Sequence, residues 1–211
     1  ALVNAVTHAP GLSALFKWLG GVAQQRDVPN FAESTFVDWF RNRQSSINHQ
    51  SAIRNQQSVV LWADTFNNYF HPQTAIAATE VLEAAGCDVA VPKTPMCCGR
   101  PLYDYGFLGE AKERLRDVVR GMRQHLDAGT PIVVLEPSCL AVFRDELVNL
   151  FPNDEDAKRL SSQAVLLSEF LRKQRPQFRP RLPYHVMLHG HCHHKAIASL
   201  GDEEAVLREM G

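Results

Sequence analysis

Residues 87–102, CDVAVPKTPMCCGRPL, join a short β-rich run to two adjacent cysteines and a glycine. The run CDVAVP has the length and the β-branched content of a buried strand. An isolated structural cysteine needs no neighbour, and a disulfide between adjacent residues closes a small strained ring. The adjacent thiols of Cys97 and Cys98 therefore predict a chemical role that involves a partner elsewhere in the chain.

Three more β-rich runs lie outside this stretch, and long helical patterns separate the four. They are SVVLWAD (58–64), PIVVLEP (131–137) and YHVMLHG (184–190). Between the second and third runs in chain order, apolar residues at helical spacing form one stripe along residues 107–129, and Gly129 stands where a helix C-cap is expected. Strands that alternate with helices predict an α/β fold of parallel βαβ units.

The cysteines follow the ends of the predicted strands. Cys97 and Cys98 come after the run at 87–92, Cys139 after the run at 131–137, and Cys192 after the run at 184–190. In parallel sheets, ligands gather at the carboxyl ends of the strands, so we expect these thiols to lie in one region. Cys87 instead begins a strand, and we predict that it is buried in the core.

The overall composition narrows the function classes. Lysine and arginine number 22 against 23 acidic residues, a formal net charge of -1, which predicts no basic surface for nucleic acid. The longest apolar runs are strand-sized, far short of the roughly 20 residues that cross a bilayer. No signal peptide and no initiator methionine stand at the start, so we expect the chain to begin inside a longer protein. Five cysteines, an odd number, favour a reduced cytoplasmic protein that uses thiolates as ligands or nucleophiles.

The segments outside the βα pattern are polar or amphipathic. Residues 11–23 and 32–43 predict helices that need another surface to cover them, and residues 42–57 predict a linker or surface loop. The basic, proline-containing segment 172–181 is interpreted either as a linker or as a docking strip for an acidic redox partner. Setting residues 185–196 over 58–69 gives an offset of 127 residues, with Cys192 over Thr65, which suggests a duplication that is cut off after its start.

Four features together resemble the cysteine-rich CCG domain. They are CCGRPL, the amphipathic helix after it, EPSC (136–139) and HGHCHHKA (189–196). This domain occurs in heterodisulfide reductase B subunits and in the iron-sulfur subunits of glycolate oxidase and anaerobic glycerol-3-phosphate dehydrogenase. It is also fused behind FAD-linked D-2-hydroxyacid dehydrogenases, such as those for D-lactate and D-2-hydroxyglutarate. Residues 9–21 and 36–43 are similar to the connector after the ferredoxin-like part of the fused enzymes, so the resemblance favours the fused type.

The resemblance implies a Rossmann-like organisation and a redox role. Residues 1–57 would be a helical connector, 58–182 a complete first CCG repeat with its linker, and 183–211 the start of a second repeat. The implied ligands of a 4Fe-4S type iron-sulfur cluster are Cys97, Cys98, Cys139 and Cys192, with FAD on another domain. The implied partners are the flavin and ferredoxin-like domains and a quinone or redox-protein acceptor. The full complex would be cytoplasmic and peripheral to the inner face of the membrane, and this fragment alone would not be catalytic.

Two positions depart from the family pattern and keep an alternative open. Thr65 stands where the first cysteine of the repeat is expected, and Glu136 replaces the first cysteine of C-x-x-C. These replacements favour a degenerate structural or docking module that has lost its cluster. Arg100, beside the cysteine pair, is interpreted either as a charge that offsets thiolates or as a solvated loop residue.

The histidines around Cys192 suggest a further, less favoured hypothesis. An H-x-H pattern at a strand end suits zinc or another transition metal, which makes His189 and His191 candidate ligands beside Cys192. The alternative is that these histidines only hydrogen-bond to loop carbonyls. A thiol hydrolase built on Cys139 is disfavoured, because no histidine and acid partner can be assigned to it.

Overall fold

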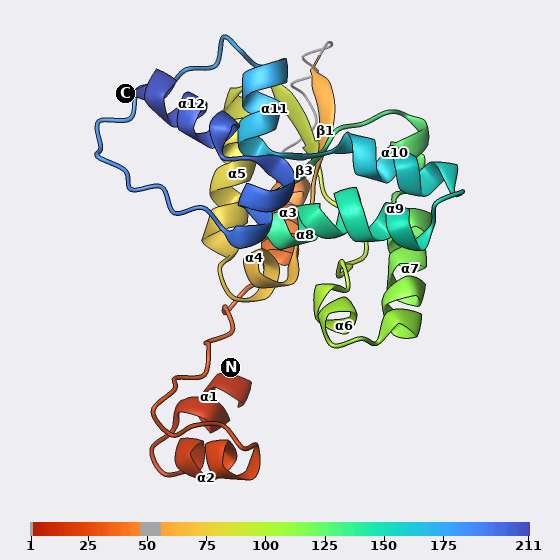
Figure 1. Cartoon of the computed structure of the whole chain (residues 1–211). Helices are drawn as coiled ribbons and strands as arrows, with labels where there is room; N and C mark the ends of the chain where they lie inside the picture. Colours follow the sequence, from red (N-terminus) through yellow and green to blue (C-terminus); the bar gives the residue numbers. More distant parts are fainter. Residues whose placement is uncertain (1, 47–55) are drawn as a thin grey trace.

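A computed structural model describes residues 2–46 and 56–211 of the chain (Figure 1). At its centre is a four-stranded, all-parallel sheet in the order β2-β1-β3-β4. The strands are β1 (Gln57–Leu61), β2 (Cys87–Ala90), β3 (Ile132–Val134) and β4 (Ala164–Leu166). The predicted α/β class with a parallel sheet is therefore confirmed.

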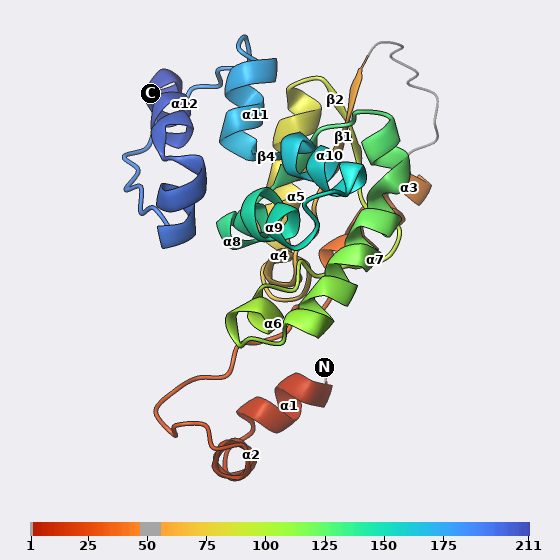
Figure 2. The same ribbon diagram turned by 45° about the vertical axis from the view of Figure 1, so that its right-hand side comes forward.

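Helices cover both faces of this sheet, as Figures 1 and 2 show, because successive strand residues turn apolar side chains to opposite sides. On one face, Val60 and Ile132 pack with α7 and α10, and on the other, Val59 and Val133 pack with α3, α5, α11 and α12. These helices are α3 (Phe36–Ser46), α5 (Pro72–Ala84), α7 (Leu108–Asp127), α10 (Glu155–Gln163), α11 (Leu167–Gln174) and α12 (Gly201–Met210).

Shorter helical pieces complete the described chain. They are α1 (Leu2–His8), α2 (Leu12–Leu19), α4 (Thr65–Tyr69), α6 (Arg100–Asp104), α8 (Pro137–Ala141) and α9 (Leu147–Leu150), with two π-helical turns, η1 (Val142–Glu146) and η2 (His194–Ala198). The turn η1 lies between α8 and α9, so that the three form one continuous helical segment after β3. The residues that follow β3 are thereby held against the sheet.

Helix α7 ends as its sequence predicts. Its buried residues Ala111, Leu115, Val118, Met122 and Leu126 form the expected stripe. Gly129 has φ 66°, and the backbone N–H of Thr130 donates to the carbonyl of His125 at 3.0 Å. A left-handed residue just after a helix closes its last carbonyls in this way and favours glycine.

The predicted strand at residues 184–190 is wrong. These residues form no strand, and Met187 at the middle of the run is 94% exposed. The place beside β3 is occupied by β4, which the sequence did not reveal. A β-rich run that has no neighbouring strand to pair with cannot satisfy its backbone groups in a ladder.

The described parts of both predicted linkers belong to the folded body or contact it. Helix α3 continues through residues 42–46 of the expected loop, and residues 47–55 of that loop lie outside the described residues. In the basic segment 172–181, Arg172 pairs with Asp202 of α12 at 2.5 Å, and Arg179 pairs with Glu209 of the same helix. This segment therefore uses its charges to hold α12.

The first two helices stand apart from the sheet. In Figures 1 and 2, α1 and α2 form a pair below the main body. Where the connecting chain reaches α4, the ring centroids of Phe31 and Phe70 are 4.6 Å apart. Trp18 and Leu19 of α2 are 70% and 71% exposed, as expected for helices that lack a covering surface. Within the described residues, no helix is both long and apolar enough to cross a membrane.

Candidate thiol site at the carboxyl edge of the sheet

Three loops at the carboxyl ends of neighbouring strands build the site. Thr65 follows β1, Cys97 and Cys98 follow β2, and Cys139 lies in α8 after β3. Strand β1 has β2 on one side and β3 on the other, so the direction in which successive strands are added to the all-parallel sheet reverses between β1 and β3. Ligands in open α/β sheets bind at such a reversal, outside the carboxyl ends of the strands.

The loop after β2 needs a glycine to present its cysteines. Gly99 has φ 80° and serves as the N-cap of α6. A β-carbon at this position would lie 3.4 Å from Cγ of Arg114, and φ itself disfavours any side chain. Gly99 therefore fixes the turn that follows Cys97 and Cys98, and this turn packs against α7.

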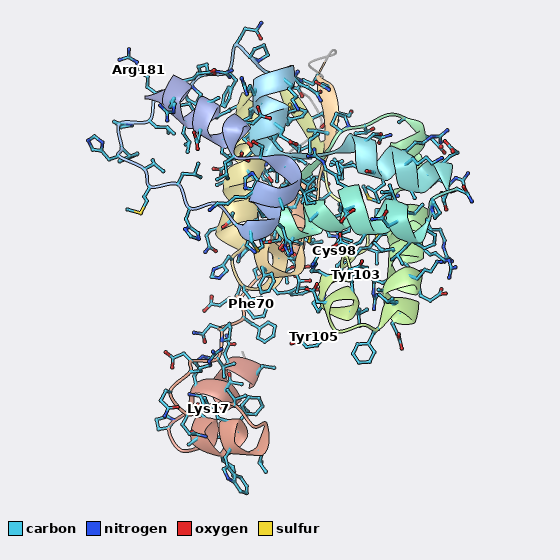
Figure 3. All side chains as sticks on the ribbon, in the orientation of Figure 1. Lys17, Phe70, Cys98, Tyr103, Tyr105 and Arg181 are labelled. Atoms are coloured by element: carbon cyan, nitrogen blue, oxygen red, sulfur yellow. The ribbon has the colours of Figure 1, made fainter. Side chains whose placement is uncertain are left out.

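Cys98 and Cys139 meet at the centre of the site. Their Sγ atoms are 3.0 Å apart, although the residues are 41 positions apart in the chain. Cys98 is 4% exposed and Cys139 6%, and both belong to the core that packs on Trp62 and Phe143. In Figure 3, Cys98 lies beside α8. The expectation that thiols from two strand ends converge is confirmed for this pair.

Cys97 lies beside the pair and is half-buried. Its sulfur accepts from the backbone N–H of Gly99 at 3.5 Å, and the side chains of Cys98 and Thr65 lie near enough to shift its pKa. Thr65, at the position where the resemblance implies a cysteine, thus lies next to the thiol cluster of Cys97, Cys98 and Cys139. Its hydroxyl oxygen is a harder ligand than a thiolate and cannot take over the role of one for a soft metal.

The environment of Cys97 and Cys98 keeps these two thiols protonated. The hydrogen bond with Cys98 raises the pKa of Cys97 far above the ordinary thiol range, and burial adds to the shift. The hydrogen bond with Cys139 likewise raises the pKa of Cys98, while the backbone N–H of Arg100 acts in the opposite direction. At neutral pH these two groups are therefore thiols, and a metal must displace their protons.

Glu136, the other position where the resemblance implies a cysteine, has a structural role. Its carboxylate is the N-cap of α8 and accepts from the backbone N–H of Ser138 at 3.1 Å. The hydroxyl of Ser138 donates to the same oxygen. A capping carboxylate satisfies N–H groups that have no partner within the helix, so Glu136 holds the turn that carries Cys139.

Arg100 is paired rather than solvated. It forms an ion pair with Glu146 of η1 and a second one with Asp104, where Nη2 and Oδ1 are 2.7 Å apart. Only 8% of the Glu146 side chain is exposed. The sequence alone gave no signal for Glu146, which lies 46 positions from Arg100. The pair ties the cysteine loop to the helix that follows β3, and Glu146 neutralises much of the charge that Arg100 brings to the thiols.

The polar residues after β1 have a structural role. Asp64 is the N-cap of α4 and accepts from Asn67 Nδ2 at 2.7 Å, and burial raises the pKa of Asp64. The side-chain oxygen of Asn68 accepts from the backbone N–H of Val37 at 3.0 Å. These bonds fasten α3 and α4 beside the thiol cluster.

Cys87 is 2% exposed in the core on the opposite face of the sheet, as predicted.

Cys192 is exposed and belongs to a different group. His191, Cys192 and His193 place their ligand atoms within 4.8 Å of one another, whereas His189 is exposed and outside this group. The backbone N–H of His193 donates to Nδ1 of His191 at 3.3 Å. Over residues 2–46 and 56–211, Cys192 makes no hydrogen bond to the other cysteines. Sequence reasoning named His191 and Cys192 but left out His193.

The comparisons with known proteins agree with the cysteine pattern. Residues 63–144, which contain the thiol cluster, match the family model described as "CCG: Cysteine-rich domain". The chain is 31% identical over 156 residues to "Lactate utilization protein A" of Geobacillus thermodenitrificans, covering 71% of this chain and 62% of that protein. The proteins of the same name from Anoxybacillus flavithermus and Geobacillus kaustophilus are 28% and 33% identical, covering 71% and 54% of this chain and 63% and 47% of theirs.

The chain thus spans less than two thirds of the length of these relatives. No solved structure matches it.

Proposed function

Because the chain carries a cysteine-rich CCG domain, we propose that it is an iron-sulfur electron-transfer module of an oxidoreductase that takes part in lactate oxidation. The observation that supports this most directly is the meeting of Cys97, Cys98 and Cys139 at the carboxyl edge of a parallel sheet. Its relatives are named for lactate utilization, and lactate is a 2-hydroxyacid. In this proposal the cysteines act as ligands of a redox centre, and no residue of this chain acts as an acid or base on the substrate.

The donor set of the thiol cluster fits an iron-sulfur centre in its chemistry. Thiolates are the usual ligands of such centres, and Cys97, Cys98 and Cys139 supply three of the four that a cluster uses. When bound, the group would supply one-electron redox chemistry. At 3.0 Å the Sγ atoms of Cys98 and Cys139 are close enough for a thiol hydrogen bond, so the pair would have to lose protons and move apart before both sulfurs could bind iron. The fourth ligand that we propose is Cys192, which would have to move from its exposed position.

Proton release sets the pH dependence of cofactor loading. Because the pKa values of Cys97 and Cys98 are raised, both groups hold protons that iron must displace. Raising the pH lowers the free-energy cost of removing these protons. We therefore expect iron uptake by the reduced protein to become tighter from pH 7 to pH 9.

The finer features of the proposal concern the whole protein. We propose that FAD on another domain oxidises a D-2-hydroxyacid, and that electrons leave through a 4Fe-4S type cluster to a quinone or a redox protein. In this scheme residues 1–57 connect to a ferredoxin-like domain, residues 58–182 form the first CCG repeat, and residues 183–211 begin the second. The complex would be cytoplasmic, at the inner face of the membrane.

Iron and sulfide analysis of anaerobically purified full-length protein tests the proposal. We expect both elements to be present, with an EPR signal in the reduced or oxidised state, and both to fall when Cys97→Ser or Cys139→Ser is introduced. Cys87→Ala is the matched control, because Cys87 is equally buried but lies on the opposite face of the sheet. An unchanged iron content in Cys97→Ser and Cys139→Ser would contradict the role of these residues.

A structural or docking module is the second candidate. It is supported by Thr65 and Glu136, which stand where the resemblance implies two cysteines, and by the role of Glu136 as the N-cap of α8. This candidate predicts a folded protein with no iron or sulfide under any condition. A zinc or other transition-metal site at His191, Cys192 and His193 is a third, narrower candidate, supported by their ligand atoms lying within 4.8 Å. It predicts zinc binding that is lost in Cys192→Ser and retained in Cys97→Ser.

A further inference from the structure

Cys98 and Cys139 are close enough to react with each other. Their Sγ atoms are 3.0 Å apart, and a disulfide needs about 2.05 Å, so an approach of roughly 1 Å would join them. The two residues sit on different elements, the loop before α6 and the first turn of α8. A bond between them would therefore link the loop before α6 to helix α8 without closing a strained local ring.

The other cysteines are poorly placed for the same reaction. Cys97 and Cys98 are adjacent, and a bond between them closes the strained ring that disfavours vicinal disulfides. Cys87 is buried in the core on the other face of the sheet. Cys192 is exposed and, within the described chain, hydrogen-bonds to neither member of the pair. Among the five cysteines, the geometry thus singles out one pair.

We propose that Cys98 and Cys139 form an intramolecular disulfide when the metal-free protein meets an oxidant of the hydroperoxide class. The two thiols lose their protons and two electrons, and a sulfur-sulfur bond forms. The oxygen-oxygen bond of hydrogen peroxide breaks, and its two oxygens take up the two electrons and two protons and leave as two water molecules. Cys97 stays a free thiol beside the new bond. This modification depends only on the two thiols and not on the proposed electron-transfer role.

The disulfide would change both the stability of the protein and its capacity to bind metal. It would close a loop between positions 98 and 139. A crosslink that closes a loop of this length stabilises the folded protein, because it restricts the unfolded chain. It would also remove two of the three thiols of the cluster, leaving Cys97 alone. The metal-free site would then be protected from irreversible oxidation of its thiols and could be reopened by a dithiol reductant.

Mass spectrometry of the reduced, metal-free chain treated with hydrogen peroxide tests the proposal. We expect a loss of 2 Da and one crosslinked peptide pair that joins residue 98 to residue 139, with Tm raised by roughly 5–10 °C and restored by dithiothreitol. Cys97→Ser combined with Cys192→Ser should still form the crosslink, whereas Cys98→Ala should not. Because the double variant keeps both reacting cysteines, the test stands even if Cys98→Ala fails to fold.

Two outcomes would overturn the proposal. One is a crosslink confined to Cys97 or Cys192 while Cys98 and Cys139 remain alkylatable after peroxide. The other is the absence of any 2 Da loss until the protein is unfolded. Neither outcome bears on the iron and sulfide content of the anaerobic protein, so failure here and failure of the proposed function can be told apart.

Discussion

The region of Cys98 and Cys139 and the region of Cys192 differ in whether paired strands support them. Cys98 and Cys139 stand at the ends of paired strands, and both are almost fully buried against Trp62 and Phe143. Cys192 follows a run with a similar strand-like sequence, yet that run pairs with nothing in the described chain and leaves Met187 94% exposed. The comparison teaches that a cysteine motif becomes a preorganised site only where neighbouring strands hold its loop.

The largest expected difference between the two regions is in stability. Phe143→Ala removes a ring that is fully buried and packs edge-on against Trp62 at 5.0 Å between centroids, and we expect it to cost about 3–5 kcal/mol. Met187→Ala in the unpaired run should stay within about 0.5 kcal/mol of the parent. Urea denaturation followed by circular dichroism measures both. Equal effects would show that residues 184–190 are packed as firmly as the thiol cluster.

Thiol reactivity should separate the regions next most strongly. The exposed Cys192 should react with iodoacetamide at pH 8 roughly 100-fold faster than Cys97 or Cys98, whose raised pKa values keep them protonated. The rates at Cys97 and Cys98 should rise with pH up to the highest pH at which the fold survives, because only the thiolate reacts. Peptide mapping after timed alkylation gives the individual rates. Similar rates at Cys97 and Cys192 would contradict this picture.

Breaking the ion pair beneath the cysteine loop should have a smaller effect. Arg100→Gln leaves the nearly buried carboxylate of Glu146 without its partner, and we expect a loss of about 2 kcal/mol of unfolding free energy. The matched control is Arg120→Gln, whose pair with Asp117 is exposed and should contribute less than about 0.5 kcal/mol. If both variants lose the same amount, Arg100 does not hold the loop.

The smallest expected effect tests the turn that presents the cysteines. Gly99→Ala forces a β-carbon onto a residue at φ 80°, with Arg114 only 3.4 Å away, and should cost about 1 kcal/mol. Gly109→Ala in α7, where nothing lies within 4 Å of the added carbon, should instead stabilise by about 0.5–1 kcal/mol. Thermal unfolding of the two variants would show shifts in opposite directions. A neutral or stabilising Gly99→Ala would mean that the turn is more adaptable than its backbone suggests.

Local patterns were enough to predict the class of the sheet and the meeting of Cys98 with Cys139. Strands β1, β2 and β3 carry clear apolar runs, and the stripe and terminal glycine of α7 are read directly from the sequence. Parallel topology then brought the carboxyl ends together, which is why the meeting of Cys98 with Cys139 could be expected. Here regular secondary structure and a general rule of α/β sheets were sufficient.

The remainder depends on tertiary pairing, which no local pattern encodes. Strand β4 has only three residues between two helices, so its run is too short to stand out. The run at 184–190 has a stronger pattern, yet it pairs with no strand of the described chain, and β4 lies beside β3. The Arg100 and Glu146 pair joins distant positions whose charges look ordinary in sequence.

The π-helical turn η1 has a consequence for comparing related sequences. Arg144 and Glu146 lie two positions apart within it, yet Arg144 pairs with Glu169 of α11 at 2.6 Å while Glu146 pairs with Arg100 of α6. A wider turn of this kind arises when a single residue is inserted into an α-helix. Relatives that lack the insertion should show a one-residue gap between the positions of Cys139 and Leu147, and they should keep at most one of these two bridges.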